Sequence, residues 1–82
     1  MTELDYKKLY AKQEGLCAIC GRPHLLDKPL HVDHDHQTGE VRGLLCVKCN
    51  MALGFFDDSV VLMFQAVNYL LKSKGVIYEN HQ

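Results

Sequence analysis

The stretch HVDHDHQTGEVRGLLCVKCN, residues 31–50, decides both the fold and the candidate chemistry of this chain. Two short runs, Leu30 to His36 and Glu40 to Leu45, are separated by a Gln-Thr-Gly tripeptide, which predicts a β-hairpin with glycine at a positive φ. A C-x-x-C motif follows the second run at once and leads into an asparagine. The stretch therefore predicts a hairpin whose second strand enters a metal-binding turn.

Four cysteines form two C-x-x-C pairs, and soft thiolate ligands in two such pairs favour a tetrahedral Zn²⁺ site. A site with four protein ligands has no open coordination position, so the predicted zinc is structural. A thioredoxin-like redox pair is the alternative, but it needs a βαβ context that this chain is too short to hold. The predicted zinc ligands are Cys17, Cys20, Cys46 and Cys49.

A second cluster of polar residues lies within or just beyond the loop that this zinc would close. Carboxylate and amide oxygens favour Mg²⁺ or Mn²⁺. A nearby imidazole, with an ordinary pKa of about 6.5, can take a proton from water at neutral pH. Together these groups are typical of metal-assisted phosphodiester hydrolysis. The members of the cluster are His31, Asp33, His34, Asp35, His36 and Asn50.

Strand alternation sets a condition on that cluster. A regular strand places Asp33 on the opposite face from His34. For both residues to serve one reaction, the segment must bend near Asp33 or the first strand must end there. Because the four cysteines already fill a tetrahedron, residue types and spacing leave two readings open: a second functional site, or a zinc knuckle with a polar hairpin.

The flanking segments predict helices. Residues 3–14 have an apolar face with Thr2 as N-cap, residues 50–53 form a short helix ended by the following glycine, and residues 60–73 form a longer helix capped by Ser59. The fold class is therefore α+β, as one small domain over residues 1–82. The apolar stripe of the last helix, predicted as core, consists of Met63, Ala66, Val67, Leu70 and Leu71.

The composition narrows the setting of the protein. A chain of 82 residues with a net charge of −1 has no global attraction to nucleic acid, so binding would rest on local patches. The sequence lacks an apolar run of membrane-spanning length and a signal-peptide pattern, which predicts a cytoplasmic protein. The candidate basic residues are Lys7, Lys8, Lys12, Arg22, Arg42 and Lys48.

The ordered motifs CAICGRP, HVDHDH and VRGLLCVKCN, followed by Ala66-Val67-Asn68-Tyr69-Leu70, resemble the recombination endonuclease VII family of HNH nucleases. The resemblance covers about residues 6–71 and combines both cysteine pairs with the Asp-His dipeptide and the asparagine. It implies a zinc-stapled ββα-metal (HNH, His-Me finger) fold, in which a hairpin and the following helix clamp one divalent ion. Helices at the N- and C-terminal sides flank this core.

The resemblance also implies roles for individual residues. Asp33 matches the metal-ligand aspartate, His34 the general base, and Asn50 the metal ligand carried by the helix. Asp35 and His36 match further motif positions that complete the metal shell, orient His34 or touch the phosphate. Hydrolysis of this kind leaves a 5′-phosphate and a 3′-hydroxyl.

These expectations define a DNA endonuclease that uses Mg²⁺ or Mn²⁺ and nicks one strand at a time with low sequence specificity. Arg42 and Lys48 are expected to contact DNA, although Arg42 could instead pair with Glu40 or another acidic neighbour. About thirty residues follow Asn50, whereas junction-resolving members of the family dimerise through a longer C-terminal region, so we expect a monomer or weak homodimer. The rival reading is a non-catalytic zinc-knuckle module that binds nucleic acid or protein.

Overall fold

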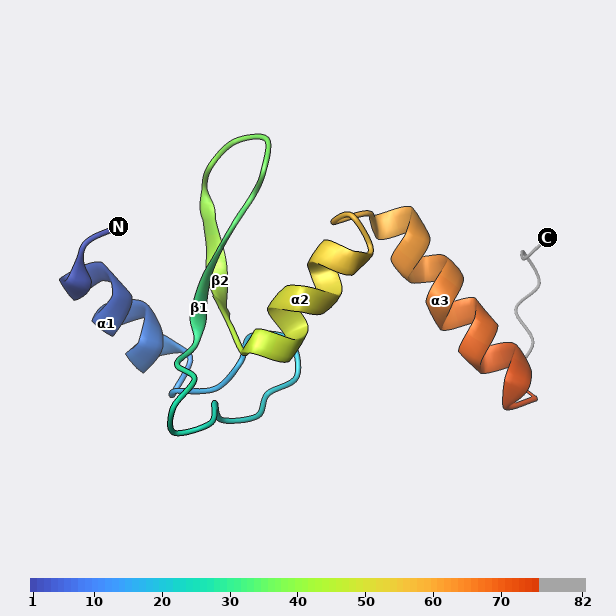
Figure 1. The fold of residues 1–82 in the computed structure, drawn as a ribbon, viewed down its shortest axis with the longest axis horizontal. Coiled ribbons are helices and arrows are strands. Elements are labelled where there is room, and N and C mark those ends of the chain that lie inside the picture. The colour runs from blue at the N-terminus through green and yellow to red at the C-terminus, as the bar shows by residue number, and fades with distance from the viewer. Residues whose placement is uncertain (76–82) are drawn as a thin grey trace. The chain divides into compact units, whose positions relative to one another are not determined.

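The computed structural model, which describes residues 1–75, has a small α+β fold with a two-stranded sheet and three helices (Figure 1). The chain divides into two compact units, Met1–Ala52 and Leu53–Gln82, and each is considered by itself. In the described part of the chain, every helix is too short or too polar to cross a bilayer. The elements are α1 (Glu3–Lys12), β1 (His31–His34), β2 (Val41–Leu45), α2 (Val47–Phe55) and α3 (Val60–Ser73).

The predicted hairpin is confirmed, and it contains an irregularity at the point that matters. Strands β1 and β2 are antiparallel, and Asp33 lies opposite Gly43. The register then shifts, because His34 lies opposite Val41 and leaves Arg42 as an extra residue in β2. Such a bulge bends the strand locally. β1 ends one residue beyond Asp33, at this irregular step. His34 lines a hollow with Val32 that Asp33 does not line, so a shared site for Asp33 and His34 stays a prediction.

The hairpin loop is held by Asp35. One of its carboxylate oxygens, Oδ1, accepts hydrogen bonds from the backbone N–H groups of Gln37 (2.8 Å) and Thr38 (3.0 Å). The N–H of Gly39 donates to the carbonyl oxygen of Asp35 at 2.8 Å. Gly39 has a φ of +79°, the positive value that the sequence predicts for it.

Helix α1 begins with the capping box expected from Thr2. Its hydroxyl accepts from the N–H of Asp5, and the Asp5 carboxylate accepts from the N–H of Thr2, each at 3.1 Å. The helix ends at Lys12 instead of residue 14, because Gln13 is its C-cap. Tyr6 connects α1 to the segment that enters β1, since its hydroxyl donates to the carbonyl oxygen of Leu30 at 2.7 Å.

Gln13 fixes the end of α1 to the outer edge of β2. Its amide oxygen accepts from the N–H of Leu44 (2.9 Å), and its amide nitrogen donates to the carbonyl oxygens of Leu44 (3.0 Å) and Leu16 (2.8 Å). Leu44 is fully buried, so its peptide groups need partners inside the protein. A β-carbon at Gly43 would lie only 3.3 Å from the Gln13 amide oxygen, which explains the glycine there.

The bounds predicted for the short helix, residues 50–53, are wrong at both ends. Helix α2 begins at Val47, inside the second cysteine pair, and continues through Gly54 to Phe55. The N–H of Asn50 donates to the carbonyl oxygen of Cys46 at 2.9 Å, which closes the first turn. A single glycine inside a helix costs only about 1 kcal/mol relative to alanine, so Gly54 does not end it.

Helix α3 has the predicted bounds and the predicted N-cap, Ser59, whose hydroxyl accepts from the N–H of Leu62 at 3.1 Å. Within the second unit, no residue of α3 is buried, and the core role of its apolar stripe stays a prediction. The buried residues instead surround the hairpin and the cysteines, where strands and turns enclose them. They are Cys17, Leu30, Asp33, Gly43, Leu44, Leu45 and Cys49.

We expect Gln13→Ala to lower the free energy of unfolding by about 2 kcal/mol, because it leaves the buried Leu44 N–H without a partner. Gln13→Glu keeps an acceptor for this N–H but loses the two donated bonds, so its effect should be smaller. Lys12→Ala, at the exposed neighbouring position, should change stability by less than about 0.5 kcal/mol. Urea unfolding followed by circular dichroism measures all three, and equal stability of the Gln13→Ala and Lys12→Ala proteins would contradict the role of Gln13.

Candidate functional site

The two cysteine pairs meet in space as the sequence predicts. The Sγ atoms of the four cysteines all lie within 4.8 Å of one another, and those of Cys20 and Cys46 are 3.9 Å apart. A tetrahedron with Zn–S bonds of about 2.3 Å has edges of about 3.8 Å. The thiols are not joined as disulfides. The arrangement therefore fits one structural zinc ion.

Backbone geometry directs both pairs toward this centre. The N–H of Ile19 points at the Cys17 sulfur (3.4 Å), and the N–H of Cys49 points at the Cys46 sulfur (3.5 Å). These contacts stabilise negative charge on sulfur. The first pair lies in a turn after α1 and the second at the start of α2, so a shared ion would connect the two ends of the intervening loop.

The thiols differ in acidity. Burial opposes ionisation of Cys17, but hydrogen bonds from backbone N–H groups outweigh it and lower the pKa of this thiol to about 6. Burial, together with contacts to the neighbouring cysteines, raises the pKa of Cys49 to about 12. Cys17 is therefore the more acidic of these two thiols. The full set of four thiolates needs a divalent cation to offset their mutual repulsion.

Asp33, the predicted metal ligand, is only 8% exposed and is bound by Arg42. Its Oδ2 accepts from Nε of Arg42 at 2.7 Å, and its Oδ1 accepts from an Nη atom at 3.1 Å. The bulge in β2 provides the arginine, because Arg42 is the residue without a register partner. Of the two roles left open for Arg42, the structure contains the ion pair, and its partner is Asp33 instead of Glu40.

His34 has a different environment from Asp33. It is exposed and lines an open hollow of about 490 Å³ together with Val32, Tyr6 and the first residues of α1. His31 and His36 are also exposed. Within residues 1–75, the side chains of these three histidines form no hydrogen bond or ion pair. Their ring nitrogens are available to water, metal or substrate.

Asn50 lies in the first turn of α2, directly after the buried Cys49. Its side-chain amide likewise has no partner within the described residues. Among the His, Cys, Asp and Glu side chains described, the four cysteines are the group whose ligand atoms are close enough for a metal, so Asp33 and the histidines do not form such a group. A metal ion at Asp33 would share the carboxylate with Arg42. A carboxylate has about four lone pairs, and Arg42 uses two, so Asp33 can accommodate both.

Asp35 and Lys48 complete the predicted set. Hydrogen bonds from the backbone N–H groups of Thr38 and Gln37 lower the pKa of Asp35, so its carboxylate holds the hairpin loop in its ionised form. This contact is structural, and a catalytic role for Asp35 stays a prediction. Lys48 is exposed in the first turn of α2 and lines a pocket beside Cys46.

Two contacts that hold the fold together were not predicted from the sequence, and each joins segments that are distant in the sequence. Gln13 binds the edge of β2, as described above. The His24 ring connects α1 to the loop before β1: a carbonyl can only accept, so Nδ1 donates to Leu25 O (2.8 Å), and Nε2 is hydrogen-bonded to the Tyr10 hydroxyl (3.0 Å). No local pattern marks either residue, because each contact depends on the folded path of the chain.

These features define a small α+β protein with a four-cysteine metal centre next to an Asp-His strand end. The chain belongs to the recombination endonuclease VII family, whose model matches residues 1–72. The family membership supports nuclease activity in general and confirms the resemblance found in the sequence.

Two relatives come from mycobacterial phages. The Gene 59 protein of Mycobacterium phage D29 is 44% identical over 77 residues, covering 93% of this chain and 47% of the relative. The Gene 59 protein of Mycobacterium phage L5 is 45% identical over 77 residues, with the same coverage of each chain. The chain therefore spans about half the length of these curated relatives.

We expect Cys46→Ser to lose zinc and cooperative folding. Structural zinc contributes roughly 10–16 kcal/mol of binding free energy, as much as the whole stability of a typical domain at about 5–15 kcal/mol. Ala18→Ser is the control, because it adds a hydroxyl between two ligands without removing one. Atomic emission should find about one zinc per chain in the wild type and the control. A folded, zinc-free Cys46→Ser protein would show that the metal is not what holds the loop.

Proposed function

We propose that this domain is a metal-dependent DNA endonuclease of the HNH type, which hydrolyses phosphodiester bonds and nicks one strand at a time with low sequence specificity. Family membership supports a nuclease and a nucleic-acid substrate. The metal, the catalytic residues and the mode of cutting are the parts that we add. A monomer or weak homodimer acting in the cytoplasm remains our expectation.

The observation that carries the proposal is the order of elements around the polar residues. Strands β1 and β2 form an antiparallel hairpin, and α2 begins two residues after β2 (Figure 1). Asp33 and His34 lie at the end of β1, and Asn50 lies in the first turn of α2. This order of elements supports the ββα arrangement that the resemblance implies, in which a carboxylate, an imidazole and an amide share one site.

Asp33 and Asn50 are the proposed ligands of Mg²⁺ or Mn²⁺. When bound, the ion would stabilise negative charge on the phosphoryl group and on the leaving oxygen. Arg42 holds the Asp33 carboxylate through two hydrogen bonds, so the orientation of this ligand is fixed before an ion binds. Cys49, as a zinc ligand, would likewise fix the backbone next to Asn50 before a catalytic ion binds. The structural and catalytic centres are thus adjacent in sequence.

His34 is the proposed general base. Its ring is exposed in an open hollow, and it has no internal partner within residues 1–75, so one ring nitrogen can accept a proton from an attacking water. Asp35 and His36 stay assigned to the site as neighbours that could bind the phosphate or orient His34. In either role, Asp35 would also keep its hydrogen bonds to the backbone of the hairpin loop.

We expect His34→Ala to retain fold and zinc but to lose nicking by at least about 100-fold, the usual contribution of a general base. Conversion of supercoiled plasmid to open circles with Mn²⁺ or Mg²⁺ measures the rate. His31→Ala is the matched control, because it removes another exposed histidine of the same strand. Asp33→Ala should also be inactive. Wild-type nicking by His34→Ala would exclude the role of base, and an inactive wild type that carries zinc would favour the binding-module reading.

Arg42→Gln tests whether this arginine acts on Asp33 or on DNA. Loss of the bidentate ion pair should lower stability by about 1–3 kcal/mol and raise the Mn²⁺ concentration needed for half-maximal nicking. The salt dependence of duplex binding in Ca²⁺ should stay unchanged. A decrease of that slope by about 0.9 would instead identify Arg42 as a phosphate contact. Lys72→Gln, on the exposed surface of α3, controls for the change in net charge.

A further inference from the structure

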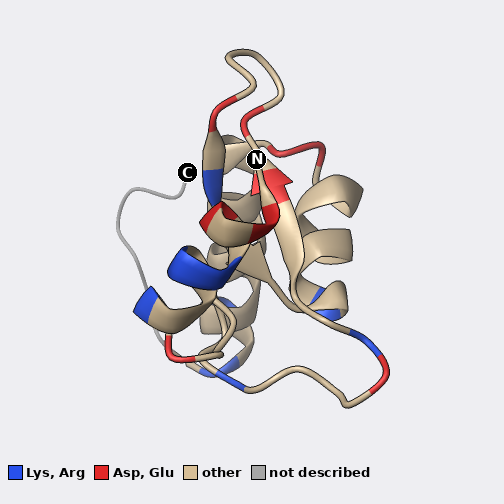
Figure 2. Ribbon diagram, turned by 90° about the vertical axis from the view of Figure 1, so that its left-hand side faces the viewer, with Lys and Arg blue, Asp and Glu red and all other residues tan. Residues whose placement is uncertain are grey.

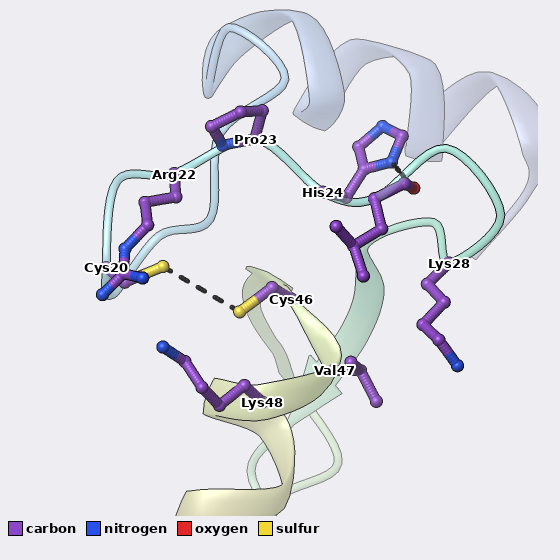
Figure 3. Close-up of a pocket in the computed structure, with 9 residues that line it drawn as sticks. Cys20, Arg22, Pro23, His24, Lys28, Cys46, Val47 and Lys48 are labelled. Atoms are coloured by element: carbon purple, nitrogen blue, oxygen red, sulfur yellow. Dashed lines mark hydrogen bonds between the residues drawn. The ribbon is translucent and has the colours of Figure 1, made fainter.

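A pocket of about 240 Å³ lies beside the second cysteine pair (Figure 3). This pocket is separate from the proposed catalytic site, because its lining does not include Asp33, His34 or Asn50. Its walls combine cationic and apolar side chains with the ring of His24 and two of the predicted zinc ligands, Cys20 and Cys46. The cationic residues are Arg22, Lys28 and Lys48, and the apolar residues are Pro23, Leu25 and Val47.

The charge of this pocket differs from that of the rest of the chain. The chain has a net charge of −1, yet no aspartate or glutamate lines the pocket. Within residues 1–75, none of the three cations forms an ion pair, whereas Lys7 pairs with Glu3 and Arg42 with Asp33. Figure 2 shows acidic segments on both flanks of the hairpin loop, and both acidic and basic segments on α1 and in the connecting loops. The pocket is therefore complementary to an anion.

The positions of the charges fit an extended ligand better than a single ion. Arg22 and Lys48 lie on the side of Cys20, and Lys28 lies on the opposite side of the pocket (Figure 3). Apolar side chains line the space between them. A nucleic-acid strand presents the same pattern, because each apolar sugar face is flanked by two phosphates.

One wall of the pocket is held in place before any ligand binds. The Nδ1 atom of His24 donates to the carbonyl of Leu25, and its Nε2 atom is hydrogen-bonded to the Tyr10 hydroxyl on α1. The N–H of Lys28 donates to the same carbonyl at 3.1 Å. The turn that carries Leu25 and Lys28 is thus fixed to the helix, which lowers the entropy that binding would otherwise cost.

Charge balance at the cysteines could explain part of this arrangement. A zinc ion with four thiolates carries a net charge of about −2, and Arg22 and Lys48 lie close enough to Cys20 and Cys46 to offset it. Lys28 lies on the far side of the pocket and has no such role. A contribution of Lys28 to binding would therefore distinguish a ligand site from charge compensation at the zinc-bound thiolates.

We propose that this pocket binds the DNA backbone at a position separate from the phosphate that is cut. One sugar lies against Pro23, Leu25 and Val47, and its two phosphates bind Lys28 on one side and Arg22 with Lys48 on the other. The inference rests on the proposed nuclease function, and it adds Arg22 and Lys28 to the residues that contact DNA.

A pair of adjacent leucines provides the first test. Leu25 lines the pocket, whereas Leu26 is fully exposed and does not. Binding of a short fluorescein-labelled duplex is measured by anisotropy in Ca²⁺, after circular dichroism confirms folding. Leu25→Glu should weaken binding about tenfold, because it places a carboxylate between the phosphates, and Leu26→Glu should weaken it less than about threefold. Equal losses would overturn the proposal.

The salt dependence provides the second test. Removing one cation that binds a phosphate lowers the slope of log K against log salt by about 0.9. Lys28→Gln should therefore show this decrease, and Lys72→Gln, which changes net charge equally in α3, should not. An unchanged slope for Lys28→Gln, or the same change in both variants, would overturn the proposal and leave charge compensation as the role of Arg22 and Lys48.

These measurements are independent of cleavage, so the two proposals can fail separately. If the wild type nicks plasmid but the pocket variants bind duplex normally, the pocket inference is wrong and the nuclease stands. If the pocket variants lose binding as expected but no divalent ion supports cutting, the nuclease proposal is wrong while the backbone site stands.

Discussion

The meeting of the two cysteine pairs is the constraint on which the rest of the first unit depends. It joins the turn after α1 to the start of α2, and the hairpin lies in the segment between them. The buried core is small and consists largely of this junction and the residues beside it. Because so little apolar surface is enclosed, the thiol cluster and a few polar contacts such as Gln13 with Leu44 maintain the geometry of the hairpin.

Local patterns in the sequence were enough to predict the elements whose signals are local. The hairpin, Gly39 at a positive φ, and the caps at Thr2 and Ser59 depend on neighbours a few residues away. The α2 bounds were wrong because a metal-ligand turn and a helix start share Cys46–Cys49. The contacts of Gln13 and His24 could not be predicted, because their partners lie far along the chain or depend on the loop path. An ion pair of Arg42 with an acidic neighbour was among the expectations, but its partner, Asp33, depends on the bulge in β2.

The bulge in β2 has two consequences for the candidate site. A regular hairpin would place Arg42 in the pairing register, and the bulge releases it to bind Asp33. The ion pair makes burial of the Asp33 carboxylate tolerable, and it also fixes the orientation of the proposed metal ligand. His34, one residue on, faces an open hollow and keeps its ring unpartnered within residues 1–75. Burial and exposure at consecutive positions thus separate a positioned ligand from a group free to move protons.

The bulge also determines where the length of this chain can change. The loop between the strands, residues 36–40, is exposed, so insertions there would lengthen a surface turn without moving the strands. Residues 41–46 have no such freedom. Removing or adding one residue between the bulge and the second cysteine pair would turn every following side chain of β2 to the opposite face and shift the sulfur ligands with it. Among related chains, variation in length should therefore occur in the hairpin loop and stop at the bulge.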